Sequence, residues 1–315
     1  MNFIKFDNST IKSQMDMNAT NLYNYRIKYL ITNTDLEVDG FLKLSSIDDI
    51  SNSEISNGLF FLHFNTDDEY LYHLEKIIEQ NGKFLIQTNC AKYSFVHSNK
   101  FCNLALSHKL KIPPFAFTQT VAENICQAIE QTKNLEGDYV EIGVSKGDSA
   151  LTALLYLTYA NLKRRMFLLD TFDGFDYDEA TNSVETYWNK YACSHKLYGP
   201  EATMNFIDNR LKEACPNQEF KLVRSNICID SLPSEIDKIV IANVDVDMYE
   251  ATRDAFIKVA DKIVKGGIII AEDPTSTPAL IGSFYAMEKF LETDSGKKFM
   301  KLNMVGQYFL IKIFD

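Results

Sequence analysis

Several features that define common protein classes are missing from this sequence of 315 residues. None of its six cysteines forms a C-x-x-C pair and no cluster of histidines accompanies them, so we expect neither a zinc site nor a disulfide framework. No apolar run is long enough to cross a bilayer, and the first residues lack the apolar core of a signal peptide. These absences predict a globular protein of the cytoplasm.

An excess of positive charge is also missing. The formal net charge is -11, which argues against a nucleic-acid partner because no basic tract compensates for it. The densest basic run, Lys163-Arg164-Arg165, is interpreted as a helix end that complements the helix dipole. With 46% hydrophobic residues the chain has enough apolar side chains for a sizeable core.

Two adjacent prolines, Pro113 and Pro114, predict a boundary between an N-terminal module, residues 1–112, and a second domain, residues 113–315. In the module, apolar spacing predicts a strand over 58–64, a helix over 67–80 and a strand over 83–87. The periodicity of residues 1–50 does not decide their structure. We therefore expect a small α/β or α+β module without recognisable chemistry.

From residue 118 onward, strand and helix patterns alternate. The expected strands are 138–142, 166–170, 220–224, 239–244, 267–271 and 307–313. The expected helices are 118–132, 148–162, 200–214, 250–263 and 280–293. Alternation of this kind predicts a largely parallel sheet covered by helices on both faces.

A turn with two glycines follows the first of these strands. A dinucleotide fingerprint that ended at Gly147 would need glycines at 142 and 144, where Ile142 and Val144 stand. A nicotinamide-dependent oxidoreductase is therefore the weakest interpretation. The pattern acid-x-G-x-x-x-G, from Glu141 through Gly143 to Gly147, instead resembles motif I of class I S-adenosylmethionine-dependent methyltransferases.

Acidic residues recur at the predicted strand ends. We expect Glu141 to contact the methionine end of the cofactor, and Asp170 to accept hydrogen bonds from the ribose hydroxyls. The following helix is expected to be capped by Asp148 or Ser149.

Two further acidic pairs, Asp245 with Asp247 and Glu272 with Asp273, follow later strands. Carboxylates that converge at one sheet edge repel each other unless a cation or proton lies between them, which favours a Mg²⁺ site.

Taken in order, Glu141-x-Gly143-x-x-x-Gly147, Asp170-Thr171-Phe172-Asp173-Gly174, Asp245-x-Asp247-x-Tyr249-Glu250-x-Thr252 and Glu272-Asp273 resemble the macrocin O-methyltransferase family over roughly residues 118–315. The resemblance implies that Asp245 and Asp273 bind the metal, and that Asp247 is the general base. Glu272 stands where the family usually has aspartate. The further cofactor contacts implied are Gly143, Ser145, Gly147, Ser149, Thr171, Phe172, Asp245, Ser225 and Asn226. Segment 175–200 would lie over the substrate as a lid, with Tyr177, Tyr187, Trp188 and His195.

The expected protein is a Mg²⁺-dependent O-methyltransferase with a Rossmann-like domain, which uses S-adenosylmethionine to methylate a sugar hydroxyl of a glycan, nucleotide sugar or glycosylated natural product. We expect a homo-oligomer without nucleic-acid or membrane partners. Two alternatives stay open. One is a catechol-type O-methyltransferase that acts on a phenol or diol, and the other is a protein that binds the cofactor without turnover.

Overall fold

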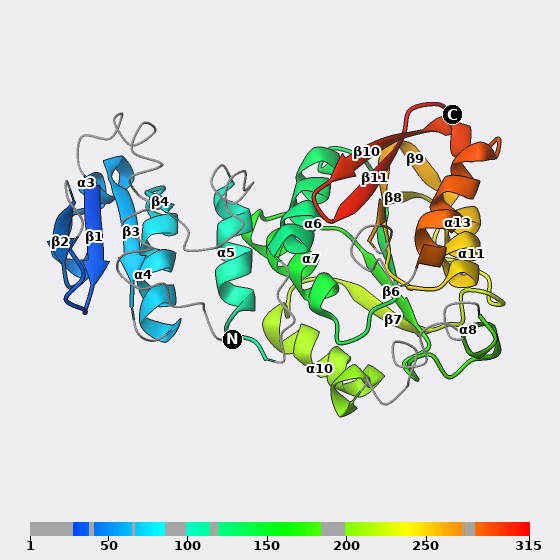
Figure 1. Cartoon of the computed structure of the whole chain (residues 1–315), viewed down its shortest axis with the longest axis horizontal. Helices are drawn as coiled ribbons and strands as arrows, with labels where there is room; N and C mark the ends of the chain where they lie inside the picture. The colour runs from blue at the N-terminus through cyan, green and yellow to red at the C-terminus, as the bar shows by residue number, and fades with distance from the viewer. Residues whose placement is uncertain are drawn as a thin grey trace. The chain divides into compact units, whose positions relative to one another are not determined.

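The computed structural model describes residues 28–37, 41–64, 67–85, 99–113, 119–183, 199–272, 274 and 281–315. By its internal contacts the chain divides into two compact units, Met1–Ser107 and His108–Asp315, which we describe separately. Figure 1 shows the strands of unit 1 in blue and the larger unit 2 in green to red. The functional division at residue 112 stays a prediction.

Unit 1 contains a four-stranded sheet with the strand order β2-β1-β3-β4, in which every neighbouring pair is parallel. The predicted strand–helix–strand sequence is confirmed as β3, α4 and β4. The short strands β1 and β2 lie within the segment whose periodicity gave no prediction. The bounds are β1 Lys28–Thr32, β2 Leu42–Leu44, α3 Asn52–Asn57, β3 Leu59–His63, α4 Asp67–Glu79, β4 Lys83–Leu85 and α5 Lys100–Lys109.

Unit 2 contains a seven-stranded mixed sheet with the order β10-β11-β9-β8-β5-β6-β7. Four predicted strands, 138–142, 166–170, 220–224 and 239–244, have the bounds that the sequence gave, because each contains closely spaced apolar residues. The strands are β5 Asp138–Ile142, β6 Met166–Asp170, β7 Phe220–Arg224, β8 Ile239–Val244, β9 Ile263–Ala271, β10 Phe299–Met304 and β11 Gln307–Lys312. The helices are α6 Gln119–Thr132, α7 Asp148–Tyr159, α8 Asp178–Thr181, α10 Met204–Ala214, α11 Tyr249–Ala260 and α13 Ile281–Glu292.

Three strands differ from the prediction. β11 ends at Lys312, one residue earlier than expected. β9 begins at Ile263, four residues earlier than expected, and contains a bulge where Ile263 pairs with Ile239 but Ile268 pairs with Ile241. Gly266, with φ +82°, absorbs the extra residues of the bulge. β10 was missed altogether. It pairs antiparallel with β11 at the edge of the sheet, where most of its side chains are exposed and supply no apolar run.

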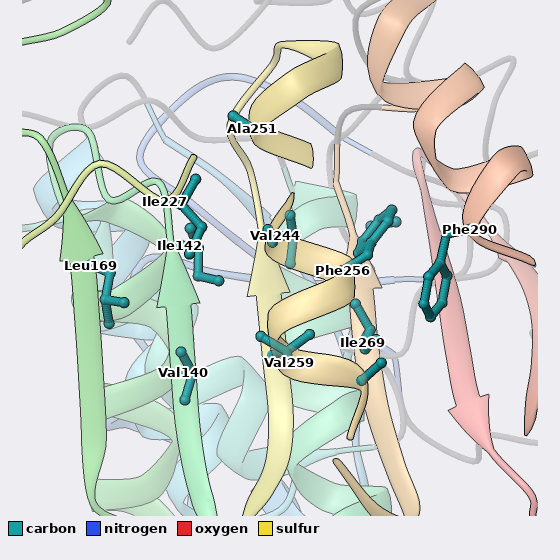
Figure 2. Packing of buried hydrophobic residues seen from close by; sticks show 14 of the residues in the cluster. Val140, Ile142, Leu169, Ile227, Val244, Ala251, Phe256, Val259, Ile269 and Phe290 are labelled. Carbon is teal, nitrogen blue, oxygen red and sulfur yellow. The ribbon is translucent and has the colours of Figure 1, made fainter. Parts of the chain in front are cut away.

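Helices cover both faces of the larger sheet (Figure 1). α6 and α7 pack together on one face, and α11 and α13 pack together on the other. Figure 2 shows the second layer, in which Phe256 and Val259 of α11 pack over Val244 and Ile269. These side chains are fully or almost fully buried. The packing fixes the strands whose ends form the site.

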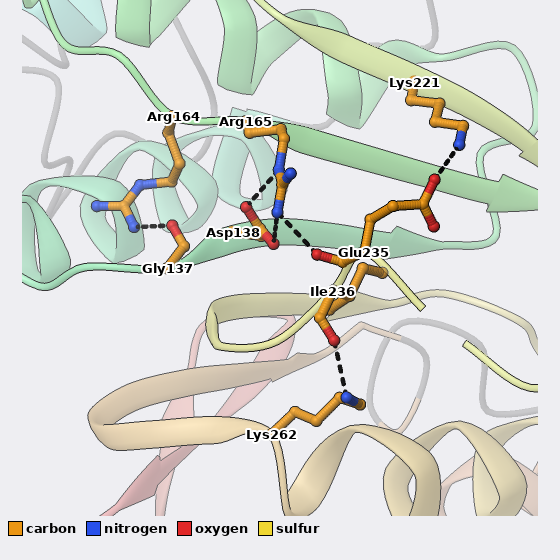
Figure 3. Close-up of polar contacts among 8 residues, drawn as sticks. All are labelled: Gly137, Asp138, Arg164, Arg165, Lys221, Glu235, Ile236 and Lys262. Atoms are coloured by element: carbon orange, nitrogen blue, oxygen red, sulfur yellow. Dashed lines mark hydrogen bonds and ion pairs between the residues drawn. The ribbon is translucent and has the colours of Figure 1, made fainter. Parts of the chain in front are cut away.

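The basic run at residues 163–165 stabilises the amino edge of the same sheet (Figure 3). Arg164 donates to the carbonyls of Thr132, Leu135 and Gly137, so it complements the end of α6 rather than that of α7. Arg165 binds both oxygens of Asp138 at 2.9 and 2.8 Å. No helix among the described residues is long and apolar enough to span a membrane.

Candidate active site

The carboxyl ends of β5, β6, β7 and β8 surround a cavity of about 180 Å³. These strands meet where the sheet reverses its order between β5 and β8, the place where open α/β sheets bind ligands. Eight of the predicted site residues line it, and they are Gly143, Ser145, Asp170, Thr171, Ser225, Asn226, Asp245 and Asp247. The topology therefore brings together residues that are more than a hundred positions apart in the sequence.

The glycine turn after β5 depends on the absence of side chains. A Cβ atom at Gly143, where φ is +89°, would lie 1.7 Å from the carbonyl oxygen of Asp245. No other residue fits that contact, so Gly143 lets the β5 turn approach the end of β8. Gly147, with φ +79°, is the N-cap of α7 and makes no side-chain capping bond. The predicted capping role of Asp148 or Ser149 is therefore wrong, because the left-handed glycine itself starts the helix.

Asp170, at the end of β6, organises two loops at once. Its Oδ2 accepts hydrogen bonds from the backbone N–H groups of Val144 at 2.6 Å and Ser145 at 3.0 Å. Its Oδ1 accepts from the N–H of Phe172 at 2.7 Å. The hydroxyl of Thr171 lies 3.5 Å from Oδ1, but its single proton is better placed to bond to the carbonyl of Gly174 at 2.9 Å. A carboxylate has about four lone-pair sites, so Asp170 keeps capacity to accept a hydroxyl from a ligand in the cavity.

Unusual backbone conformations gather around the cavity. Three non-glycine residues with positive φ lie just after the strands that form it: Ser145 at +49°, Phe172 at +55° and Asp247 at +61°. Such conformations cost on the order of 1–3 kcal/mol each and persist where the surroundings over-determine them. At Asp247 the surroundings include a tight three-residue turn, in which the N–H of Met248 donates to the carbonyl of Val246.

Three carboxyl groups crowd the ends of β8 and β9. The pKa of Asp245 lies well above its usual range because the group is buried and because Glu272 and Asp247 lie nearby. Its side chain also shares a hydrogen bond with that of Glu272. The backbone places Glu272 there, since its N–H donates to the carbonyl of Val244 at 3.1 Å. A cation or a shared proton is needed to offset this repulsion.

The structure describes two of the three predicted metal ligands. Asp245 and Glu272 are neighbours, whereas Asp273 lies outside the described residues. Within the described part of the chain, no three His, Cys, Asp or Glu side chains are arranged to hold a metal ion. The two ligands that are described, Asp245 and Glu272, are hard oxygen donors of the kind that Mg²⁺ prefers, but two carboxylates do not by themselves form a metal site.

The loop after β7 forms another wall of the cavity. The Oγ of Ser225 is buried and has no hydrogen-bond partner among the residues that the structure describes, although it belongs to a residue that lines the cavity. Asn226 is held in place, because its Nδ2 donates to Glu179 at 3.0 Å and its Oδ1 accepts from the N–H of Cys228. Ser225 thus offers a hydroxyl to a ligand, while Asn226 is already engaged.

Some predicted cofactor residues do not line the cavity. Glu141 is fully buried between the sheet and the helices, where its Oε2 accepts from the hydroxyl of Tyr139 at 3.1 Å. Burial raises the pKa of Glu141 to about 8. Gly147, Ser149 and Phe172 also lie outside the lining. For these residues a direct cofactor contact stays a prediction.

The cavity has members that the sequence did not single out. One of them is Ile227, which adds apolar surface beside the predicted polar groups. Phe175 and Tyr177, both within the predicted lid segment 175–200, line the cavity as well. Burial raises the pKa of Tyr177, so its hydroxyl stays protonated. Tyr187, Trp188 and His195, the other predicted lid residues, lie outside the described residues.

This strand order, with a glycine turn after the first central strand and an acid after the next, is that of the class I methyltransferase fold. The profile of the family described as macrocin-O-methyltransferase (TylF) matches residues 73–309, well over half of the chain, and the chain therefore belongs to that family of O-methyltransferases. The match begins in α4, earlier than the resemblance seen in the sequence.

Solved structures support the same fold. The O-methyltransferase NovP has 16% sequence identity and a TM-score of 0.54, with 79% of this chain and 100% of NovP covered. The calicheamicin methyltransferase CalS11 has 19% identity and a TM-score of 0.50, with 80% and 95% covered. An apo structure of CalS11, described as a TDP-rhamnose 3′-O-methyltransferase, gives 18% identity, a TM-score of 0.44 and coverage of 80% and 97%. A search of curated protein sequences gave no match.

Proposed function

We propose that this O-methyltransferase transfers the methyl group of S-adenosylmethionine to a sugar hydroxyl of a glycan, a nucleotide sugar or a glycosylated natural product, with the help of Mg²⁺. The observation that carries the proposal is the crowding of Asp245, Asp247 and Glu272 beside the cavity that Gly143 and Asp170 shape. Carboxylates in this arrangement can bind a cation and accept a proton next to a bound cofactor.

The cofactor would be held by groups on three strand ends. Asp170 would accept from the ribose hydroxyls with the lone pairs that its backbone donors leave free. The buried hydroxyl of Ser225 would bond to a polar atom of the ligand, and Gly143 and Ser145 would let the turn approach it. Apolar neighbours such as Phe175 and Ile227 would exclude water from the sulfonium.

Asp245, Glu272 and Asp273 would hold the metal. A Mg²⁺ ion held by these residues would supply a Lewis acid that lowers the pKa of the acceptor hydroxyl. Asp247 would take the hydroxyl proton, since it lines the cavity and lies in a strained turn next to Asp245. The protein would then align the hydroxyl oxygen with the methyl group on the sulfonium sulfur. The methyl–sulfur bond breaks as the oxygen–methyl bond forms, so S-adenosylhomocysteine is the leaving group.

The sugar acceptor is supported by relatives rather than by pocket shape. The family is described by macrocin O-methylation, and CalS11, at a TM-score of 0.50, is described as a calicheamicin methyltransferase. A phenolic acceptor and a protein without turnover are the competing outcomes. The homo-oligomer and the cytoplasmic location stay predictions that sizing chromatography and cell fractionation would check.

The decisive experiment has two stages. Calorimetric titration with S-adenosylhomocysteine, with NAD as the control ligand, tests the cofactor site. An acceptor panel of nucleotide sugars, glycosides and catechols is then assayed by mass spectrometry with Mg²⁺ and with excess EDTA. We expect the protein to bind S-adenosylhomocysteine but not NAD. We also expect it to methylate a sugar acceptor in a reaction that excess EDTA stops.

Other results would each remove a stated part of the proposal. Absence of S-adenosylhomocysteine binding would remove the cofactor site. Full turnover in EDTA would remove the metal, and transfer to catechols alone would replace the sugar by a phenol. Cofactor binding without transfer to any acceptor would favour a non-catalytic protein.

A further inference from the structure

The glycine turn is held on a second side, by α10. Arg210 of α10 donates to the carbonyl oxygen of Lys146 at 2.6 Å, inside the turn. The same guanidinium reaches Asp148 Oδ1, at the first residue of α7, at 3.0 Å. Ile207, one helical turn earlier, packs so closely that a Cβ atom at Gly147 would lie 3.1 Å from it. One helix thus contacts three consecutive residues, the last two of the turn and the first residue of α7.

Arg210 is built into this place rather than lying on the surface. Its side chain is only 3% exposed, and its Nη2 also donates to the carbonyl of Ile112 at 3.2 Å. The guanidinium therefore joins the segment before Pro113 to the turn. Its planar fork of donors can satisfy several acceptors at fixed angles, which an ammonium group cannot do.

A second buried cation supports the same carboxylate. The Nζ of Lys109 lies 3.8 Å from Asp148 Oδ1, and the Lys109 side chain is 4% exposed. Burial lowers the pKa of Lys109, and the charge of Asp148 opposes that shift. Charged groups are almost never buried to this extent unless they are paired, so the cluster is costly to dismantle.

The turn therefore lies between two anchors. Asp170 binds the N–H groups of Val144 and Ser145, and Arg210 binds the carbonyl of Lys146, the next residue. Ser145 has a strained positive φ of +49°. Strain of this kind persists only where contacts over-determine the backbone, and the two anchors supply those contacts.

We propose that Arg210 is a positioning residue for cofactor binding, which holds the outer side of the 143–147 turn in the conformation that presents its inner side to the ligand. The inference rests on the proposed cofactor site at this turn. Lys109 and Ile112, which the sequence assigned to the N-terminal module, belong to the same support.

The chain offers a matched control. Arg164 is another arginine that donates to backbone carbonyls, those of Thr132, Leu135 and Gly137, but it does so at the amino edge of the sheet (Figure 3). Arg210→Met and Arg164→Met thus remove comparable bonds, and only the first touches the turn. Arg210→Lys keeps the charge while losing the fork, and it provides a variant for the case in which Arg210→Met does not fold.

The experiment measures S-adenosylhomocysteine affinity by calorimetry and amide hydrogen exchange across residues 143–148, in full-length variants shown to be folded by circular dichroism. For Arg210→Met we expect affinity to fall roughly tenfold or more, and exchange in the turn to accelerate without ligand. For Arg210→Lys we expect an affinity and an exchange rate between those of Arg210→Met and the wild type. Arg164→Met should lower thermal stability but keep wild-type affinity and exchange in the turn.

Wild-type affinity in Arg210→Met would overturn the proposal, and so would an equal loss in Arg164→Met, because the effect would then be one of general stability. If the wild type itself binds no S-adenosylhomocysteine, the proposed cofactor site fails. In that case unchanged exchange at residues 143–148 in Arg210→Met would separately reject the positioning role.

Discussion

The two units contain parallel strands that reverse their order at a central point, between β1 and β3 in unit 1 and between β5 and β8 in unit 2. In unit 1 the polar groups at that point bond to each other. Thr34 Oγ1 lies 2.9 Å from Thr32 Oγ1 and 3.1 Å from the Nδ1 of His63, and Asn33 donates to both oxygens of Glu69. In unit 1, therefore, the polar side chains at the point of strand reversal satisfy one another's hydrogen bonds.

The equivalent edge of unit 2 has the opposite character. There the strand ends carry residues with positive φ, crowded carboxyl groups and the unpartnered hydroxyl of Ser225. Among the described residues of unit 1, the only non-glycine residue with positive φ is Asn81, which follows α4 rather than a strand. The comparison teaches that a reversal of strand order creates a possible ligand-binding site. Backbone strain and unsatisfied polar groups then indicate which of these possible sites binds a ligand.

The largest effect is expected at Asp247. Asp247→Asn should abolish methyl transfer to the sugar acceptor that the wild type methylates, because an amide cannot take the hydroxyl proton. S-Adenosylhomocysteine affinity should stay within about twofold, since asparagine tolerates positive φ as aspartate does. Asp247→Ala separates the two roles, because it should also lower the free energy of unfolding by about 1–2 kcal/mol. Equal losses of transfer and of cofactor affinity in Asp247→Asn would reject the base assignment.

The next effect tests the organiser of the two loops. Asp170→Asn replaces one carboxylate oxygen by an amino group, which cannot accept from the N–H groups of Val144 and Ser145 or from that of Phe172. Loss of these charge-assisted bonds should weaken S-adenosylhomocysteine binding by at least roughly tenfold in calorimetry. Asp173→Asn, at an exposed residue paired with Arg224, is the control and should bind as the wild type does. Similar affinities in all three proteins would remove Asp170 from the site.

Glu141 lies near this edge but is expected to act on stability. Burial raises the pKa of Glu141 from 4.5 to about 8. Between these two values the side chain is protonated in the folded protein and ionised in the unfolded chain. Stability from this group is therefore present at low pH and falls as the pH rises towards 8, by about 1.4 kcal/mol per pH unit. Glu141→Gln should lack that decline in urea unfolding followed between pH 6 and 8, whereas the exposed control Glu235→Gln should follow the wild type. Parallel curves for wild type and Glu141→Gln would contradict the shifted pKa.

The residues just named show what sequence reasoning could and could not reach. Asp170 and Asp245 were assigned to the cavity because they end buried strands, and the carboxyl ends of parallel strands share one edge. Glu141 precedes the last residue of β5, so its side chain lies within the layer between sheet and helices. Arg210 carried no local signal, because its partners Lys146 and Ile112 are 64 and 98 positions away.

The elements show the same limit. β8 was predicted with its full bounds because all six of its residues are buried. β10 is an exposed edge strand that is defined by pairing with β11 rather than by its own pattern. Apolar periodicity indicates which residues are buried. It therefore predicts strands of the core such as β8, and it misses an exposed strand such as β10, which only backbone hydrogen bonds define.

The smallest effect is expected in unit 1, and it tests the other half of the comparison. Thr34→Val removes the hydroxyl that bonds to His63 and accepts from the N–H of Leu36 at 3.3 Å, but keeps the branched shape. The free energy of unfolding should fall by about 1 kcal/mol, with faster hydrogen exchange confined to β1 and β3. Methyl transfer and cofactor affinity should not change. Ser56→Ala, which removes an exposed hydroxyl of the same unit, should change none of these quantities. A loss of methyl transfer in Thr34→Val at unchanged stability would show that the reversal point of unit 1 is also a working site, and the contrast between the two edges would then be wrong.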